Sequence, residues 1–146
     1  MSLEDLYRDV ILDHYRNPRH REPLTDPDAT AEGVNPLCGD EVKVELAFDG
    51  DRLTDISVRG QGCSISQSSA SMMSEAVMGK TRDEVVEIAR RFNAMMTADD
   101  ETAAGLDPSR PGSVLGDLEA LQGVRQYPVR IKCASLPWTT LEQALG

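Results

Sequence analysis

The sequence has little aromatic side-chain content and little cysteine. Its 146 residues include one Trp, three Tyr, two Phe and three Cys. An odd number of cysteines leaves one thiol over in any disulfide pairing, and the chain opens with no charged-then-apolar signal segment. We therefore expect free thiols in a reducing compartment and a cytoplasmic location.

Basic residues are also scarce. Fifteen Lys and Arg stand against 25 Asp and Glu, which gives a formal net charge of −10. Nucleic-acid-binding domains carry clustered basic residues, so this balance argues against a nucleic-acid partner. No apolar run approaches the roughly 20 residues that a membrane span requires. We expect no membrane partner, and a single domain over residues 1–146 that builds a core without disulfides.

The first half of the chain changes from helical to strand periodicity. Apolar spacing predicts a helix from a Ser2 cap to about Tyr15, ended by Asn17-Pro18. Residues 19–34 are expected to be irregular, with a brief strand near 32–34. Strict alternation over 42–48, an Asp49-Gly50 turn and a return over 54–59 then predict a β-hairpin.

The second half is predicted to be mainly helical. Two glycines in Gly60-Gln61-Gly62-Cys63 precede a helix that begins near Ser64. Thr81 to Glu84 is a capping box that opens the next helix. The methionines at 72, 73, 78, 95 and 96 are interpreted as core residues.

The last third is harder to interpret from periodicity. Residues 99–113 are expected to form a surface insertion, followed by a short helix over 114–121. Residues 127–132 are predicted to be extended. A final helix is expected over about 136–144, with Pro137 in its first turn.

The three cysteines carry the chemistry of the sequence. Cys38 and Cys63 lie beside glycines, Cys133 ends an apolar run, and Asp40 follows two residues after Cys38. Three thiolates and a carboxylate are a complete tetrahedral ligand set for a divalent metal such as zinc. Free cysteine is also often buried as inert packing. From the residues alone, a metal or reactive-thiol site and three unrelated core cysteines both stay open.

Several segments together resemble a known family. These are Leu6-Tyr7 through His14-Tyr15-Arg16-Asn17-Pro18, Cys38-Gly39-Asp40, Gly60-Gln61-Gly62-Cys63-Ser64-Ile65-Ser66 and Arg130-Ile131-Lys132-Cys133. They resemble the IscU/SufU/NifU N-terminal family of iron–sulfur cluster assembly proteins, over nearly the whole chain. The resemblance implies an α+β fold, in which a small antiparallel sheet packs against helices and the metal site lies at one exposed end.

Within that family the sequence resembles SufU-type proteins more than IscU-type scaffolds. Lys132 stands where IscU-like scaffolds carry a histidine, and residues 127–130 replace their Leu-Pro-Pro-Val-Lys segment. The resemblance to SufU implies a zinc-dependent sulfurtransferase that accepts persulfide sulfur on Cys38 from a SufS-like, pyridoxal-phosphate-dependent cysteine desulfurase. A thiol reductant or a downstream Suf scaffold would then take the sulfur.

The resemblance also implies the residues of the site. Cys38, Asp40, Cys63 and Cys133 would hold Zn²⁺, with Asp40 as the exchangeable ligand. Arg130 and Lys132, which lie beside Cys133 in the sequence, are expected to attract the persulfide or the desulfurase.

Two alternatives to a sulfurtransferase remain at this stage. The same three cysteines and Asp40 could assemble and transfer a [2Fe–2S] cluster, in which case the chain is a scaffold and not an enzyme. A purely structural zinc module is the third class, and Asp40 argues against it because closed structural sites prefer cysteine and histidine ligands.

Overall fold

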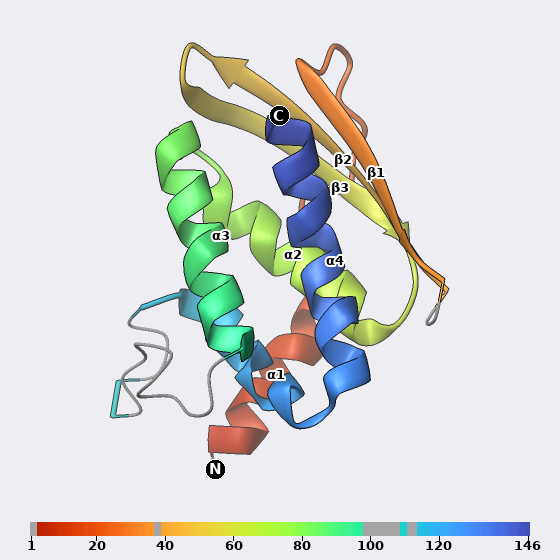
Figure 1. Ribbon diagram of the computed structural model, residues 1–146, viewed down its shortest axis with the longest axis vertical. Helices are drawn as coiled ribbons and strands as arrows, with labels where there is room; N and C mark the ends of the chain where they lie inside the picture. The colour runs from red at the N-terminus through yellow and green to blue at the C-terminus, as the bar shows by residue number, and fades with distance from the viewer. Residues whose placement is uncertain (1–2, 37–38, 98–108, 111–113) are drawn as a thin grey trace.

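The computed structural model describes residues 3–36, 39–97, 109–110 and 114–146. The elements follow one another in the order α1 (Leu3–Arg16), β1 (Ala29–Asn35), β2 (Asp40–Asp49), β3 (Arg52–Gln61), α2 (Ser64–Val77), α3 (Arg82–Thr97), the 3₁₀ helix η1 (Gly116–Gln126) and α4 (Pro128–Leu145). Figure 1 shows a three-stranded sheet covered by helices. The predicted α+β class is confirmed.

The sheet is antiparallel in the order β1-β2-β3. Residues 42–46 of β2 and 56–58 of β3 form the predicted hairpin, and their alternate side chains, including Val44 and Leu46, are fully buried under the helices. Residues of the lead-in after α1 reach the other face, where the Leu24 amide donates to Glu45 3.2 Å away. Glu45 is therefore buried, and Arg59 pairs with it at 2.6 Å.

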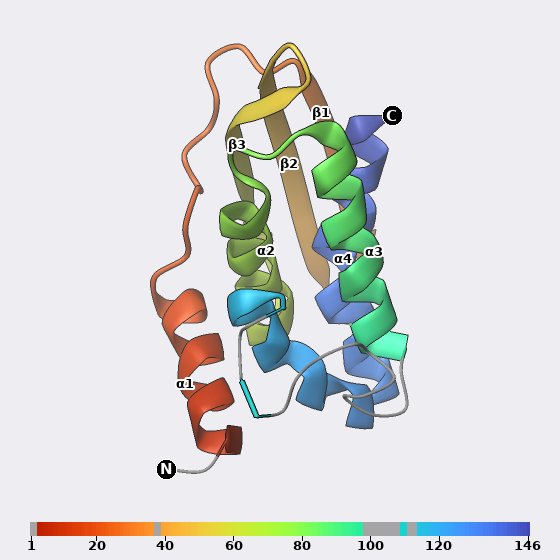
Figure 2. The same ribbon diagram turned by 90° about the vertical axis from the view of Figure 1, so that its left-hand side faces the viewer.

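The core lies between the sheet and the helices. α2 and α4 contact the sheet, and Figure 2 shows α1 on the opposite side of α2 from α3 and α4. Phe92 of α3 stacks on Trp138 of α4, with ring centroids 4.7 Å apart. Four of the predicted core methionines, at positions 72, 73, 95 and 96, are buried, and Met78 packs against the core.

Both predicted helix starts after the hairpin are confirmed. α2 begins at Ser64 with Cys63 as its N-cap. The capping box opens α3: the Thr81 amide donates to Glu84 at 3.0 Å, and the Glu84 amide donates to the Thr81 hydroxyl at 3.2 Å. The predicted Ser2 cap and most of the surface insertion over 99–113 lie outside the described residues.

Two predicted elements differ from the structure in extent or type. The strand expected near 32–34 spans all of β1, because its residues pair with β2 from Ala29 to Asn35. The short helix expected over 114–121 is the 3₁₀ helix η1 and begins at Gly116.

The extended segment predicted over 127–132 is wrong, because α4 already begins at Pro128. Proline is well suited to a first helical position, since its fixed φ is helical and its missing N–H has no partner to lose there. β-branched Val129 and Ile131 have a lower helix propensity, and the proline start outweighs it. Pro137 lies inside α4, not in its first turn.

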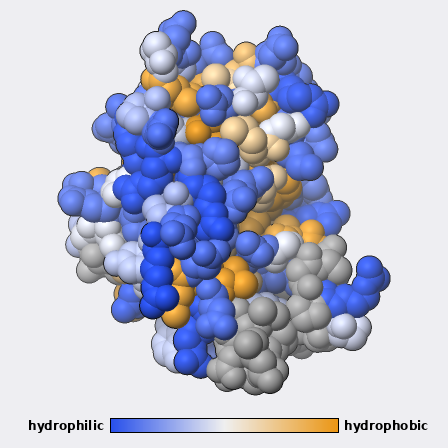
Figure 3. Space-filling model, turned by 180° about the vertical axis from the view of Figure 1, so that it is seen from behind, coloured by the Kyte–Doolittle hydropathy of each residue, from blue (hydrophilic) through white to orange (hydrophobic). Residues whose placement is uncertain are grey.

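The surface reflects the acidic composition. The face opposite to that of Figure 1 is mainly hydrophilic, with hydrophobic residues in narrow bands (Figure 3). Within the described part of the chain, no helix has the length and apolar character of a membrane span.

Candidate metal centre

Cys63 is placed by the end of the hairpin. β3 stops at Gln61, and Cys63 caps α2 with an extended backbone, φ −72° and ψ 167°. Its carbonyl accepts the first hydrogen bond of the helix, from the Gln67 amide, at 3.1 Å. The thiol is half-buried at the N-terminus of this helix.

Asp40 lies directly against this helix start. It is the first residue of β2 and only 1% exposed. Its Oδ1 accepts the Cys63 amide at 2.8 Å and the Ser66 hydroxyl at 3.1 Å, and its Oδ2 lies 3.9 Å from Cys63 Sγ. Gly62, with φ +151°, makes room, because a Cβ there would meet Oδ1 at 2.2 Å.

Cys133 approaches from the C-terminal helix. It is fully buried in the second turn of α4, which contacts β1. The Asn35 amide nitrogen, at the end of β1, lies 3.9 Å from Cys133 Sγ. Pro137 has no N–H to donate to the Cys133 carbonyl, so the helix ladder is interrupted at this cysteine.

The structure therefore brings three of the four predicted ligands together. Asp40, Cys63 and Cys133 each offer a ligand atom, and these atoms all lie within 4.8 Å of one another. In a tetrahedral zinc site, metal–ligand bonds of about 2.0–2.3 Å separate the ligand atoms by about 3.5–3.8 Å. The 3.9 Å between Asp40 Oδ2 and Cys63 Sγ fits that geometry. Cys38, the fourth predicted ligand, lies outside the described residues.

The two predicted basic residues lie on different sides of α4. Arg130 is exposed and lines a groove of about 750 Å³ with Tyr7 and Ile65. Lys132 is exposed and lines a smaller hollow with Val34 and Asn35. The two cations thus flank the turn that precedes Cys133 and open onto separate surfaces.

Sequence reasoning missed two neighbours of the site. Ser66 could have been predicted from the sequence, because it lies three residues after Cys63. A hydroxyl in the first turn of a helix lies close to the end of the strand before it. Asn35 could be found only from the register of β1, which pairs it with Asp40.

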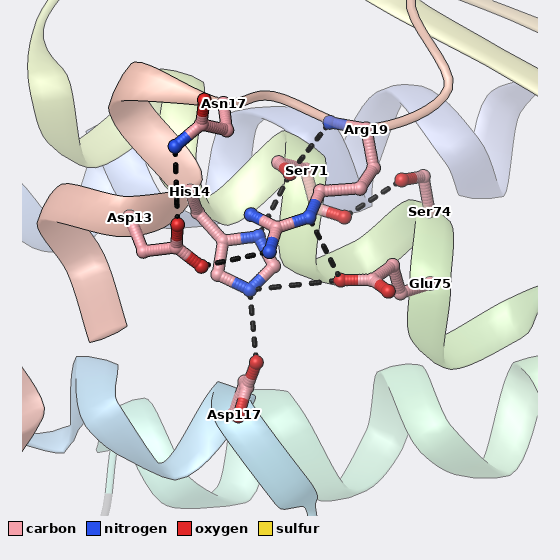
Figure 4. Close-up of polar contacts among 8 residues, drawn as sticks. All are labelled: Asp13, His14, Asn17, Arg19, Ser71, Ser74, Glu75 and Asp117. Carbon is pink, nitrogen blue, oxygen red and sulfur yellow. Dashed lines mark hydrogen bonds and ion pairs between the residues drawn. The ribbon is translucent and has the colours of Figure 1, made fainter.

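A second polar cluster joins α1, α2 and η1 (Figure 4). His14 is fully buried, with Nδ1 2.8 Å from the Ser71 hydroxyl and Nε2 2.9 Å from Asp117 Oδ2 and 3.7 Å from Glu75 Oε1. An imidazole protonated at Nε2 satisfies both close contacts, because it donates to Asp117 and accepts from Ser71. His14, Glu75 and Asp117 also have ligand atoms within 4.8 Å of one another.

This cluster already contains a cation. Arg19 donates to Asp13 at 2.7 Å and lies 3.4 Å from Glu75. The hydrogen bond from Arg19 holds the pKa of Asp13 below its usual value, and Asp13 raises the pKa of Arg19. A guanidinium within the cluster repels a divalent metal. We therefore interpret the His14 cluster as a structural contact that packs α1 and η1 on α2.

Comparison with known proteins identifies the family of the chain. Residues 6–134 match the NifU-like N terminal domain family. The chain belongs to this family.

Relatives of both expected types are found. The chain is 42% identical, over 99% of its length and 92% of the relative, to the zinc-dependent sulfurtransferase SufU of Bacillus subtilis. It is 37% identical, over 99% of its length and 85% of the relative, to the iron–sulfur cluster assembly scaffold protein IscU of Streptococcus pyogenes. The crystal structure of FiSufU from Fervidobacterium islandicum superposes with a TM-score of 0.81 at 34% identity, covering 99% of this chain and 100% of that one.

Proposed function

We propose that the chain is a zinc-dependent sulfurtransferase of iron–sulfur cluster assembly, which accepts sulfur on Cys38 from a SufS-like cysteine desulfurase. The observation that carries this proposal is the convergence of Asp40, Cys63 and Cys133. The similarity to a zinc-dependent sulfurtransferase over almost the whole chain supports the choice of metal and reaction.

In this proposal the four ligands have different roles. Asp40, Cys63 and Cys133 would hold the zinc from three separate elements of the fold. Bound zinc would keep the cysteine ligands deprotonated at neutral pH. A thiolate at Cys38 is then available as a nucleophile without a neighbouring base, since the thiolate and not the thiol attacks sulfur.

The transfer step is a thiol–disulfide type exchange. The Cys38 thiolate attacks the outer sulfur of a persulfide on the desulfurase, a new S–S bond forms on Cys38, and the desulfurase cysteine leaves as a thiolate. No net oxidation occurs in this step. Pyridoxal phosphate chemistry belongs to the desulfurase, and release of the sulfur as sulfide needs two electrons from a thiol reductant, unless a downstream Suf scaffold takes it as persulfide.

The second candidate is a scaffold for a [2Fe–2S] cluster held by the same residues. Relatives named as IscU scaffolds support it, at 37% identity in Streptococcus pyogenes and 30% in Thermotoga maritima. Soft thiolate ligands suit iron–sulfur clusters as well as zinc, so the donor set fits both. Lys132 and the 127–130 segment, which depart from the IscU pattern, favour the sulfurtransferase.

Mass spectrometry after incubation with a cysteine desulfurase and cysteine tests the proposal. We expect a sulfur adduct on Cys38 of the parent and none on Cys38→Ser, which should keep its fold and fail to stimulate the desulfurase because a serine hydroxyl is a poor nucleophile without a base. An adduct on Cys63 or Cys133 with Cys38 unmodified would contradict the assignment.

A further inference from the structure

We infer that Ser66 is a positioning residue of the metal centre. Its hydroxyl and the Cys63 amide together hold Oδ1 of Asp40, so that Asp40 binds the metal through Oδ2 alone and stays bound while another ligand is exchanged. The inference rests on the proposed zinc centre and goes beyond it, because it assigns a role to a residue that is not a ligand.

The hydrogen bonds to Asp40 divide its two oxygens. Oδ1 receives the Cys63 amide at 2.8 Å and the Ser66 hydroxyl at 3.1 Å. Oδ2 receives only the weak, long hydrogen bond of the Cys63 thiol among the described donors, with Sγ 3.9 Å away, so it faces the side where the cysteine sulfurs gather. A carboxylate held in this way presents one oxygen to a metal, since the other is occupied.

The Ser66 hydroxyl has three possible acceptors. Its Oγ lies 3.1 Å from Asp40 Oδ1, 3.1 Å from the Cys63 carbonyl and 3.9 Å from Cys63 Sγ. The ionised carboxylate is a stronger acceptor than the carbonyl or the more distant sulfur, because hydrogen bonds to charged groups are roughly twice as strong as neutral ones. Ser66 is only 3% exposed, so water does not compete for this bond.

The two hydrogen bonds to Asp40 Oδ1, which we call the Asp40 clamp, change which ligand is expected to be exchangeable. The same amide that bonds Asp40 belongs to Cys63, so the two ligands are tied together at the start of α2. Releasing Asp40 from the metal would not free it to move, because both donors still hold Oδ1. The sequence led us to expect Asp40 as the exchangeable ligand, whereas the inference drawn from these hydrogen bonds makes it a fixed one.

Ser66→Ala and Ser68→Ala form a matched pair of variants. Ser68 is also buried in the first half of α2, but its hydroxyl bonds only to carbonyls of its own helix, those of Ser64 at 2.5 Å and Ile65 at 3.3 Å. Zinc affinity is measured on the full chain by competition with a chromophoric chelator. We expect Ser66→Ala to bind zinc about tenfold more weakly than the parent, as for other residues that orient ligands. Ser68→Ala should match the parent.

A double-mutant cycle with Asp40→Ala separates positioning from general stability. If Ser66 acts through Asp40, Ser66→Ala should cause no further loss of zinc affinity in the Asp40→Ala background, where the three thiolates still hold the ion. Cobalt-loaded Ser66→Ala should keep the thiolate-to-cobalt absorption, because no sulfur ligand is lost. Ser66→Thr keeps the hydroxyl and should restore affinity.

Two results would overturn the inference: equal zinc affinity of Ser66→Ala and Ser68→Ala, or an equal loss from Ser66→Ala with and without Asp40. These titrations need no desulfurase. An unmodified Cys38 in the sulfur-transfer assay would therefore count against the sulfurtransferase and leave the role of Ser66 standing.

Discussion

Two clusters in this molecule place carboxylates close to a histidine or cysteines, and they differ in their source of positive charge. The His14 cluster has Arg19, which pairs with Asp13 and Glu75. In the part of the chain that the structure describes, no basic side chain forms an ion pair with Asp40 at the other cluster. The hydrogen-bond donors to Asp40 there are neutral groups: the Cys63 amide, the Ser66 hydroxyl and, at 3.9 Å, the Cys63 thiol.

The difference indicates which cluster needs an ion. Burying an ionised carboxylate costs several kcal/mol unless a cation or a full set of hydrogen bonds compensates it. In the His14 cluster the carboxylates of Asp13, Glu75 and Asp117 are exposed and do not carry this cost, and Arg19 pairs with two of them. Asp40 is only 1% exposed, and there a metal would supply the compensation, together with the charge needed to keep two thiols deprotonated. Proximity of metal-binding residue types therefore does not by itself define a metal site.

The largest expected effect is loss of the metal on removal of a buried thiolate ligand. Cys63→Ala and Cys133→Ala should each lose zinc and melt at a lower temperature, because metal binding is coupled to folding. Zinc at a thousand times its dissociation constant stabilises a fold by about 4 kcal/mol. Metal analysis and thermal unfolding of each variant check this, and unchanged zinc content in both would contradict the ligand assignment.

Removal of His14 should lower stability without loss of zinc. His14→Ala breaks contacts to Ser71 and Asp117 and leaves a cavity and unpaired groups, at a cost of about 2–3 kcal/mol of unfolding free energy. Zinc content should stay the same. Urea unfolding of the zinc-loaded protein with metal analysis tests both parts, and a loss of zinc equal to that of Cys133→Ala would erase the distinction between the clusters.

Cations at the rim of the metal centre should affect docking and not metal binding. Arg130→Glu and Lys132→Glu are each expected to weaken desulfurase stimulation about two- to fivefold at low salt, the size of an exposed charge interaction of roughly 0.5–1 kcal/mol. The effect should shrink at high salt. Desulfurase activity is titrated with each variant at two ionic strengths. Activation curves that overlay those of the parent at both would show that these cations have no part in the mechanism.

The smallest effect is expected at Asp13. Because Arg19 lowers the pKa of Asp13 below the usual 3.8, the folded state favours the ionised carboxylate. Its contribution to stability is present above about pH 4 and is lost as the pH falls through the lowered pKa. The unfolding free energies of Asp13→Asn and the parent, measured in apo protein, should therefore differ slightly at neutral pH and converge in acid. A constant difference down to about pH 2 would contradict the pairing.

The sequence predicted most of what local chemistry decides. The hairpin, the helix start after Cys63 and the capping box at Thr81 all follow from neighbouring residues, and the structure contains them. The helix at Pro128 was missed because residues 127–132 were interpreted as extended, although proline suits the first position of a helix. The Asp40 clamp and the link between His14 and Asp117 join residues 23 and 103 positions apart, and single-sequence periodicity carries no information on such contacts.

Anaerobic purification followed by metal analysis and a visible spectrum tests the central claim most directly. A zinc-dependent sulfurtransferase predicts colourless protein with one zinc per chain, which loses that zinc in Cys133→Ala. Brown protein with iron and acid-labile sulfide in place of zinc would contradict it and favour the [2Fe–2S] scaffold.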